Sequence, residues 1–562
     1  MNILVKKACT AALVVALLAA PAVSASAQNA GAADSKPVVV ISFSGVDQIT
    51  ADLGYLSQVA GARAQGVKLA SMVGGFTQGI DKTKPWGMVV TTNGAEFKTL
   101  VFVPVTDLQT VFAIVTQLVG PPSDEGDGVF KLSAPGPLGG TSDLFVKQQN
   151  GWVFCAQSKE ELATLPNDPL ALLDGLDKQY DIAVRAYINN IPAHFRDKAT
   201  DFVKMGVQMG FMKAPQQDQT QIQQKAVDAQ LNAITSLLNE TDQFTLGWSI
   251  NSTAKTTFLD FSFTAVPGTT LAKQSELFKN TKSAFAGFLL PDAALTFNSS
   301  SVSTQEDIQQ SLTIFRSFRA ATLKELENDL DLPDEQTRDA AKQVLNSAFD
   351  LAETLIEAGK GDGGMALSLE PSGLKAIAGF YVPDGNAVEA LLKQLVDLGR
   401  AEPEFPEVKF NTETHREIRF HTLSIPIPGA QDEARQVLGD ELELAFGIGA
   451  QSVYLALGED SLPLLKSTID RSAADADKTV PPMQFNVSLN SILKFFAAYD
   501  QHLATMVAQL GGGQGQDRIS LKGKPIDNGI TVRFQLDEGA LKTISTMVEA
   551  RMNAAAAGGP GF

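Results

Sequence analysis

The sequence predicts an α+β protein of two homologous lobes. Each lobe is expected to be an antiparallel sheet built from strand–strand–helix units, with helices packed on the sheet and an N-terminal helical hairpin. Two observations lead to this prediction. The segment 86–120 recurs in outline as the segment 364–399, and a repeat of this length outranks single-residue signals. Asn-Gly pairs between apolar stretches, which favour tight hairpin turns, begin at Asn93, Asn150 and Asn528.

The N-terminus has the pattern of an export signal. Lys6 and Lys7 precede a short apolar run over residues 11–20, and Ala25-Ser26-Ala27 fits the small-x-small rule for cleavage. We therefore expect a signal peptide over residues 1–27, cleavage near Ala27, and a mature protein that is periplasmic or secreted. Residues 28–35 are expected to be a flexible N-terminus.

Charge and cysteine content limit the possible partners. The formal net charge is −18, and removal of the two lysines of the signal gives −20 (−18 − 2 = −20). Such an acidic chain lacks the basic face that nucleic-acid binding requires. No stretch after the signal has eighteen consecutive apolar residues, so no transmembrane span is expected in the mature chain. Cys155 would be its single cysteine, which excludes an intramolecular disulfide and favours a buried, inert thiol.

The first lobe is expected over residues 36–286. It starts with a strand and two short helical segments between Val46 and Ile80, followed by the hairpin around Asn93 and a helix. A buried strand, another strand, a longer helix and a closing hairpin complete it. The expected strands and helices after Ile80 are 87–92, 96–103, 107–120, 152–155, 182–187, 192–211 and 244–263.

The second lobe is expected over residues 288–552 and repeats this order. Ser303 and Glu306 form a capping box at the start of its longer helical hairpin. Val103-Pro104 and Val382-Pro383 mark equivalent positions, and from there to the end of the next helix the lobes align without a gap, 279 residues apart (382 − 103 = 279). Residues 553–562, rich in Ala, Gly and Pro, are expected to be a disordered tail.

One cluster of polar residues could form a site. His415, Glu417, Arg419 and His421 alternate along an expected strand over 414–424, so all four would lie on one face. Such a patch could serve metal or acid–base chemistry, or it could be a solvated outer face. The two histidines, six residues apart, would be about 20 Å apart along a strand, which excludes a shared metal ion within one chain.

The remaining candidates each have a structural alternative. A methionine stripe of Met205, Met209 and Met212 could line a groove or fill a core. Two acidic clusters could bind calcium, although neither has EF-hand spacing, or could lie at a solvated loop and a helix start. His194 and His502 are isolated. The acidic clusters comprise Asp124, Glu125, Asp127, Asp329, Asp331, Asp334 and Glu335.

No catalytic signature for a serine hydrolase, a zinc protease or a phosphate loop occurs in the chain. The layout resembles exported bacterial proteins of unknown function with a duplicated α+β domain. We predict no catalytic, cofactor-binding or metal-binding residue and no cofactor. The partner is expected to be an unknown envelope protein or a small ligand, with the oligomeric state open. Three functions follow: a non-catalytic binding scaffold, a carrier of an apolar ligand, or a carboxylate-dependent hydrolase.

Overall fold

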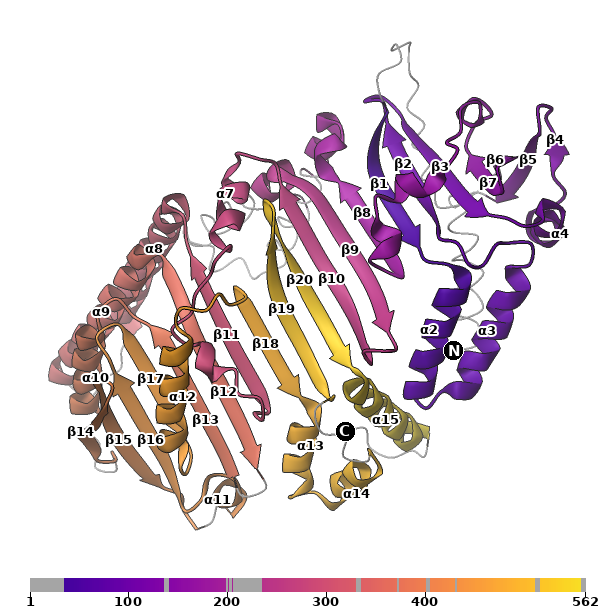
Figure 1. Cartoon of the computed structure of the whole chain (residues 1–562). Coiled ribbons are helices and arrows are strands. Elements are labelled where there is room, and N and C mark those ends of the chain that lie inside the picture. Colours follow the sequence, from indigo (N-terminus) through magenta and orange to yellow (C-terminus); the bar gives the residue numbers. More distant parts are fainter. Residues whose placement is uncertain are drawn as a thin grey trace. The chain divides into compact units, whose positions relative to one another are not determined.

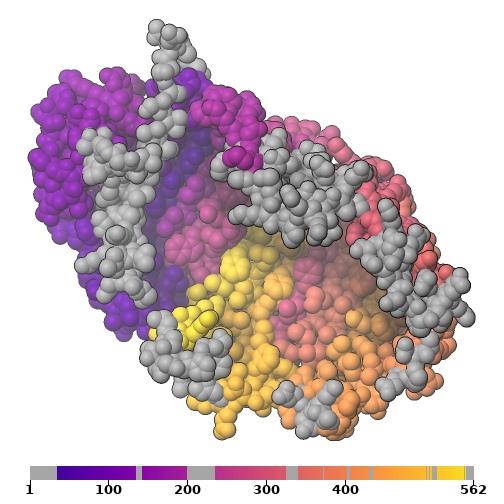
Figure 2. Space-filling view, turned by 180° about the vertical axis from the view of Figure 1, so that it is seen from behind, coloured from indigo at the N-terminus to yellow at the C-terminus, as the bar shows by residue number. Residues whose placement is uncertain are grey.

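A computed structural model describes residues 35–135, 141–198, 201, 205, 235–329, 335–370, 373–400, 405–429, 432–510 and 516–556. The other residues, grey in Figures 1 and 2, lie outside the described part, and with them the expected signal peptide. By its internal packing the chain divides into two units. Unit 1 comprises the described parts of Met1–Val203, Leu237–Val266 and Gln535–Phe562, and unit 2 comprises those of Lys204–Ser236 and Pro267–Phe534.

Both units mix helices with antiparallel sheet, which confirms the predicted α+β class (Figure 1). Within the described ranges, the strands of unit 1 pair in the order β10-β9-β8-β1-β2-β3-β7-β6-β5-β4. Its elements are β1 (Lys36–Phe43), α2 (Val46–Val59), α3 (Arg63–Phe76), β2 (Trp86–Thr92), β3 (Phe97–Pro104), α4 (Leu108–Val119), β4 (Ser123–Asp124), β5 (Val129–Pro135), β6 (Thr141–Gln149), β7 (Trp152–Ala156), β8 (Ile182–Tyr187), β9 (Thr241–Asn251), β10 (Thr256–Ala265) and α15 (Glu538–Ala556).

The described strands of unit 2 pair in the order β20-β19-β18-β11-β12-β13-β17-β16-β15-β14. Its elements are α7 (Thr270–Leu277), β11 (Leu295–Val302), α8 (Gln305–Asp329), α9 (Glu335–Ala358), β12 (Lys360–Glu370), β13 (Gly373–Tyr381), α10 (Gly385–Gly399), β14 (Val408–His415), β15 (Ile418–Pro426), α11 (Asp432–Leu438), β16 (Glu441–Ile448), β17 (Ser452–Leu457), α12 (Ser461–Asp475), β18 (Met483–Ser488), α13 (Leu489–Ala497), α14 (Gln501–Leu510), β19 (Arg518–Ile526) and β20 (Gly529–Asp537).

The two orders are the same when each strand of unit 2 is matched to the strand of unit 1 whose number is ten lower, for example β12 to β2. Register and capping match as well. Met88 pairs with Val101, and Met365 pairs with Ala378. Asp107 caps α4 with its side chain, and Asp384 caps α10 in the same way. These positions are 277 residues apart in the two units (365 − 88 = 277, 384 − 107 = 277).

This register corrects the alignment based on the Val-Pro pairs, which assumed an offset of 279 residues. Pro104 lies in β3 and pairs with Trp152, whereas Pro383 lies in the loop between β13 and α10. Val105 and Val382 are the matching residues, since their amides donate to Gly151 and Gln451, which precede β7 and β17. The Val-Pro pairs therefore coincide in sequence but not in structure.

The helix starts and hairpin turns refine two further expectations. The capping box of α8 uses Thr304 and Asp307 rather than Ser303 and Glu306, one residue later, because the helix begins at Gln305. Among the Asn-Gly pairs, Asn150-Gly151 alone has both residues at positive φ, 52° and 77°, as a type I′ turn requires. The hairpin at Asn93 closes with a longer loop, because Thr92 pairs with Phe97.

The sheets bury apolar side chains on both faces. In unit 1, α4 covers a cluster with Phe112 and Val153, and the short 3-10 turns between β7 and β8 cover a second one around Phe102 and Phe154. In unit 2, α12 lies over β13 and β17, and Phe420 is completely buried in the cluster below it (Figure 1).

Two helices pack away from the strands that precede them. α15 follows β20 but packs in unit 1, where the Tyr55 hydroxyl of α2 donates to Glu538 Oε2 at 2.8 Å. α7 follows β10 but packs in unit 2, where the Gln274 amide donates to Asp307 of α8. In unit 1, α2 follows the first strand and contacts α15, which comes after the last strand of unit 2. In unit 2, α8 follows the first strand and contacts α7, which comes after the last strand of unit 1.

Candidate functional site

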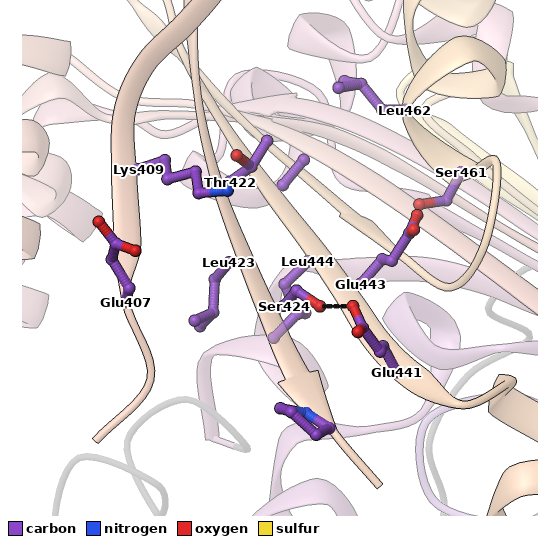
Figure 3. A pocket seen from close by; sticks show the side chains of 12 residues that line it. Glu407, Lys409, Thr422, Leu423, Ser424, Glu441, Glu443, Leu444, Ser461 and Leu462 are labelled. Carbon is purple, nitrogen blue, oxygen red and sulfur yellow. Dashed lines mark hydrogen bonds between the residues drawn. The ribbon is translucent and has the colours of Figure 1, made fainter. Parts of the chain in front are cut away.

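Unit 2 has an open pocket on the part of the sheet formed by β14, β15 and β16 (Figure 3). Its volume is about 470 Å³. Most of the side chains that line it are polar, and the first turn of α12 forms one wall. The lining residues are Glu407, Lys409, Thr422, Leu423, Ser424, Pro426, Glu441, Glu443, Leu444, Ala445, Ser461 and Leu462.

Strand pairing brings these residues together. Thr422 of β15 pairs with Lys409 of β14 on one side and with Ala445 of β16 on the other. Ser424 pairs with Glu443 in the same ladder. Residues that are paired, or two apart on one strand, share a face of the sheet. These polar residues therefore form one patch, which lies beside the first turn of α12.

The pocket is acidic. It contains three carboxylates, Glu407, Glu441 and Glu443, and one ammonium, that of Lys409. The Ser424 hydroxyl donates to Glu441 (Figure 3). Within the described residues, neither Glu407 nor Glu443 forms an ion pair or a side-chain hydrogen bond. The charge of Glu443 is therefore available to a ligand.

Ser461 adds a hydroxyl to this pocket. The residue is only 3% exposed, and its side chain points toward the Glu443 side of the pocket (Figure 3). No described residue hydrogen-bonds to its hydroxyl. The Ser461 oxygen is not among the fully buried polar atoms without a partner, so the small exposed part of this residue leaves its hydroxyl open to a ligand in the pocket.

The matching place in unit 1 carries larger side chains. The register pairs Lys131 with Phe145 and Phe145 with Ala156, as it pairs Thr422 with Ala445 and Ala445 with Ala456 in unit 2. Lys131 and Phe145 therefore stand where unit 2 has two small residues.

Asp143 and Ser133 of unit 1 match Glu443 and Ser424 of the pocket. The Lys131 ammonium lies 2.8 Å from Asp143 Oδ2, and the Ser133 hydroxyl donates to Asp143 Oδ1 at 2.9 Å. These contacts hold the pKa of the Asp143 carboxyl below its usual range, with the bond from Lys131 as the main cause. Unit 1 thus pairs this acid internally.

On the opposite face of β15, below α10, lies a buried polar cluster. His421 is completely buried, and its Nδ1 accepts the Asn411 amide at 3.0 Å, while no described group pairs with its Nε2. Glu389 of α10 accepts from Lys393 at 2.7 Å and from Arg419. Burial lowers the pKa of His421, so the imidazole is neutral.

In unit 1 the corresponding residues are aromatic. Phe112 follows its helix cap, Asp107, by five residues, as Glu389 follows Asp384. The rings of Phe112 and Phe130 meet edge to face with centroids 5.1 Å apart. The polar cluster of unit 2 thus occupies a position that packs as apolar core in unit 1.

The expected one-faced patch of His415, Glu417, Arg419 and His421 is wrong. Arg416 and Glu417 form a two-residue turn at φ 48° and 63°, and His415 pairs across it with Ile418. His415 Nε2 therefore lies 3.0 Å from Asp470 of α12. Arg419 and His421 lie under α10, as described above. The alternating pattern predicted one continuous strand, but Arg416 and Glu417 adopt positive φ values, which are rare for such residues, and the strand ends there.

The other candidates have structural roles where they are described. Cys155 is buried, which confirms its expected place in the core, and burial raises the pKa of its thiol to about 12. Asp124 accepts the Gly126 amide at 2.8 Å, and Asp127 pairs with Lys159. Met205 is 47% exposed. His194 packs on the neighbouring Phe195. Met209, Met212, Asp331 and Asp334, and the side chains of Asp329, Glu335 and His502, lie outside the described part.

Within the described ranges, no three His, Cys, Asp or Glu side chains gather as a metal site would require. No described helix has both the length and the hydrophobicity of a membrane span. Comparison of the chain with protein-family models, curated proteins and solved structures gives no match.

The pocket residues were not identified from the sequence. They are ordinary Glu, Ser, Thr and Lys residues spread over 407–462, and only the hairpin registers bring them together. One signal was present in the chain. When the two halves are aligned by their hairpins instead of by the Val-Pro pairs, Thr422 matches Lys131 and Ala445 matches Phe145. At both positions the second half has the smaller side chain.

Proposed function

We propose that this protein is an exported binding protein that holds a small polar ligand in the pocket of unit 2. The observation that carries the proposal is a pocket of about 470 Å³ on a rigid sheet, in which Glu443 and Ser461 have no described partner. Ligand sites place a few such polar groups on a preformed scaffold. The remaining sheet and helices would act as that scaffold.

We also propose that the two units arose by duplication and that one kept or gained the site. The same strand order and the same capped helix after the second hairpin strand support a common origin. A duplicated scaffold needs only one working site. The larger residues of unit 1, Lys131 and Phe145, and the pocket of unit 2 support this division of roles.

Export is part of the proposal and rests on residues 1–27. Expression of the full chain in a bacterial host, followed by fractionation and mass measurement of the N-terminus, tests it. We expect a periplasmic protein that starts at Gln28. An intact N-terminus in the cytoplasmic fraction would contradict export.

The binding function is tested with a variant that closes the pocket without a change in charge. Ala445→Phe restores the side chain that unit 1 has at this position. We expect wild-type protein to bind at least one member of a chemically diverse small-molecule panel in a thermal-shift screen, and the variant to lose that binding. Phe145→Leu in unit 1 is the matched control and should leave binding intact. If no ligand distinguishes wild type from Ala445→Phe, the pocket is not a binding site.

A second candidate, hydrolysis by carboxylates, is favoured by Glu441 and Glu443. They are two residues apart on one face of β16, which separates their Cα atoms by about 7 Å. In glycosidases, the two carboxyl groups lie about 5–10 Å apart and act by acid–base or nucleophilic mechanisms. Turnover of aryl glycosides that Glu441→Gln and Glu443→Gln each abolish would support it. Binding without turnover would favour the first proposal.

The third expectation, a carrier of apolar ligands, receives no support from this pocket, whose lining is mainly polar. The 32 phenylalanines that motivated it include the buried core residues Phe102, Phe154, Phe285, Phe288 and Phe420.

A further inference from the structure

We propose that the ligand of the unit 2 pocket is an organic dication with primary ammonium groups, and that one ammonium binds Glu443 where unit 1 places the ammonium of its own Lys131. This inference rests on the proposed binding function and names the chemical class of the ligand. It comes from a comparison of the same register position in two sheets.

Unit 1 shows which group this position binds. Lys131 Nζ lies 2.8 Å from Asp143 Oδ2, and Asp143 also accepts the Ser133 hydroxyl. Unit 2 has Glu443 at the position of the acid and Thr422 at the position of the lysine, and its serine, Ser424, donates to Glu441 instead. The acid is retained and its cation is missing, so an ammonium supplied by a ligand restores the pair.

The space that such a ligand needs is present. Phe145 packs against the core of unit 1 beside Lys131, and the matching residue of unit 2 is Ala445. Loss of the phenyl ring and of the lysine side chain leaves room over Ala445 and beside Leu462 for an alkyl chain. The methylenes of the ligand would take the place of the methylenes of Lys131.

Two further groups of the pocket fit an ammonium. Ser461, a residue that is 3% exposed, points its hydroxyl toward Glu443, and this hydroxyl has no described partner and can accept one N–H (Figure 3). Glu407 carries a second unpaired carboxylate at the β14 side of the pocket. Three carboxylates against Lys409 leave two negative charges, which match a dication rather than a monocation.

The test is calorimetric titration of the purified protein with cadaverine (1,5-diaminopentane). The neutral analogue 1,5-pentanediol and the dianion glutarate have the same chain length and serve as control ligands. We expect one cadaverine per chain, at least tenfold weaker binding of both controls, and weaker binding of cadaverine as salt screens the exposed acids.

Matched variants locate the ammonium. Glu443→Gln should weaken cadaverine binding by about tenfold, the size of a charge-assisted hydrogen bond. Asp143→Asn makes the same change in unit 1 and should leave binding unaltered. Thr422→Lys supplies the missing cation from the chain and should abolish binding. All three positions lie on exposed or partly exposed strand surface, so circular dichroism should show an unchanged fold.

The outcomes separate the two proposals. Cadaverine that binds no tighter than 1,5-pentanediol, or equally to Thr422→Lys and wild type, overturns the ammonium proposal. If glutarate or pentanediol binds instead and Ala445→Phe blocks it, the pocket still binds a ligand and only the ligand class is wrong. If Ala445→Phe affects no ligand, the binding function itself fails.

Discussion

Units 1 and 2 pair their strands in the same order but fill the two faces of the matching strands differently. Below the helix after the second hairpin strand, unit 1 packs Phe112 on Phe130, and unit 2 places Glu389 near His421. On the other face, unit 1 has Lys131 and Phe145, and unit 2 has Thr422 and Ala445.

In this fold, therefore, the side chains on matching strands can change while the pairing of the strands stays the same. The same ladder accommodates an aromatic pair or a charged cluster, because the cluster of unit 2 brings its own cations, Arg419 and Lys393, to Glu389. Both differences include a residue of β15 in unit 2, His421 on one face and Thr422 on the other. Unit 1 therefore serves as an internal reference for what unit 2 has changed.

The largest effect is expected when the polar replacement is made in unit 1 without its cations. Phe112→Glu buries a carboxylate beside Phe130, and unit 1 has Gly128 and Thr116 where unit 2 has Arg419 and Lys393. We expect a loss of about 4 kcal/mol in the free energy of unfolding. Urea unfolding followed by tryptophan fluorescence isolates unit 1, because all three tryptophans, at 86, 152 and 248, belong to it.

Phe112→Leu is the control for this substitution and should lose less than about 1.5 kcal/mol. A loss from Phe112→Glu that does not exceed that of the control would show that the helix covers this position loosely.

A smaller effect concerns an acid that unit 1 buries on the helix after its first strand. Asp52 of α2 is 3% exposed, whereas α8 of unit 2 buries Ile308 and Leu312. Burial, reinforced by nearby Asp181, raises the pKa of Asp52 to about 6. Folding thus favours the protonated carboxyl, and this contribution is present below the ordinary pKa of 3.8 and lost as the pH rises through about 6.

Asp52→Asn removes the charge and keeps the shape. We expect it to stabilise unit 1 at pH 7.5 by about 1 to 2 kcal/mol after allowance for solvent screening, and to have little effect near pH 4. Tryptophan-detected urea unfolding at the two pH values measures this. An equal effect at both would mean that Asp52 acts through packing rather than ionisation.

A smaller pH effect of opposite direction is expected in unit 2. His421 has a lowered pKa because it is buried, with Arg419 and Lys393 opposing its protonation and Glu389 favouring it. The unfolded chain takes up the proton first, so stability falls as the pH drops below the ordinary pKa of 6.5. Between pH 7.5 and 5.5 we expect a loss of about 1 kcal/mol.

Hydrogen exchange of peptides from 405–429 measures this loss locally. His421→Phe, which copies Phe130 of unit 1, should remove the pH dependence, and peptides of β5 and β6 should show none from this source. Protection in 405–429 that stays constant from pH 7.5 to 5.5, after correction for intrinsic exchange rates, would contradict a neutral His421.

The smallest effect is expected for the surface pair of unit 1. Lys131 and Asp143 are solvent-accessible, with side chains 31% and 45% exposed, and exposed pairs contribute little to stability. Lys131→Met should leave the urea midpoint unchanged within error. A clear shift would indicate that the pair is part of the core of unit 1, which would weaken its use as a guide to the pocket.

The sequence predicted the elements well where local chemistry decides them. Periodicity located the helical hairpins, and Asp107 and Asp384 act as caps because a carboxylate accepts the free amides of a first turn. The register was harder to predict. The two Val-Pro pairs have the same sequence, but the hairpins before them share the 277-residue offset. Pro383 therefore stands two positions beyond the place that matches Pro104, and it lies in the loop after β13.

The site was less accessible to sequence reasoning. A turn at Arg416-Glu417 requires positive φ from residues that seldom adopt it, so alternation in 414–424 implied one strand. The pocket arises from the absence of bulk at Thr422 and Ala445. A missing side chain becomes visible only when the matching residues of another copy are known.

The packing of α15 in unit 1 affects the order in which the chain can fold during synthesis. Chains emerge from the ribosome N-terminus first, and domains tend to fold as they emerge. Unit 1 holds the first residues made, but α15, which packs on α2 through Tyr55 and Glu538, is among the last. The half of the protein that is synthesised first therefore has to wait for the final helix before it is complete, and a chain stopped after β20 would leave its oldest part unfinished.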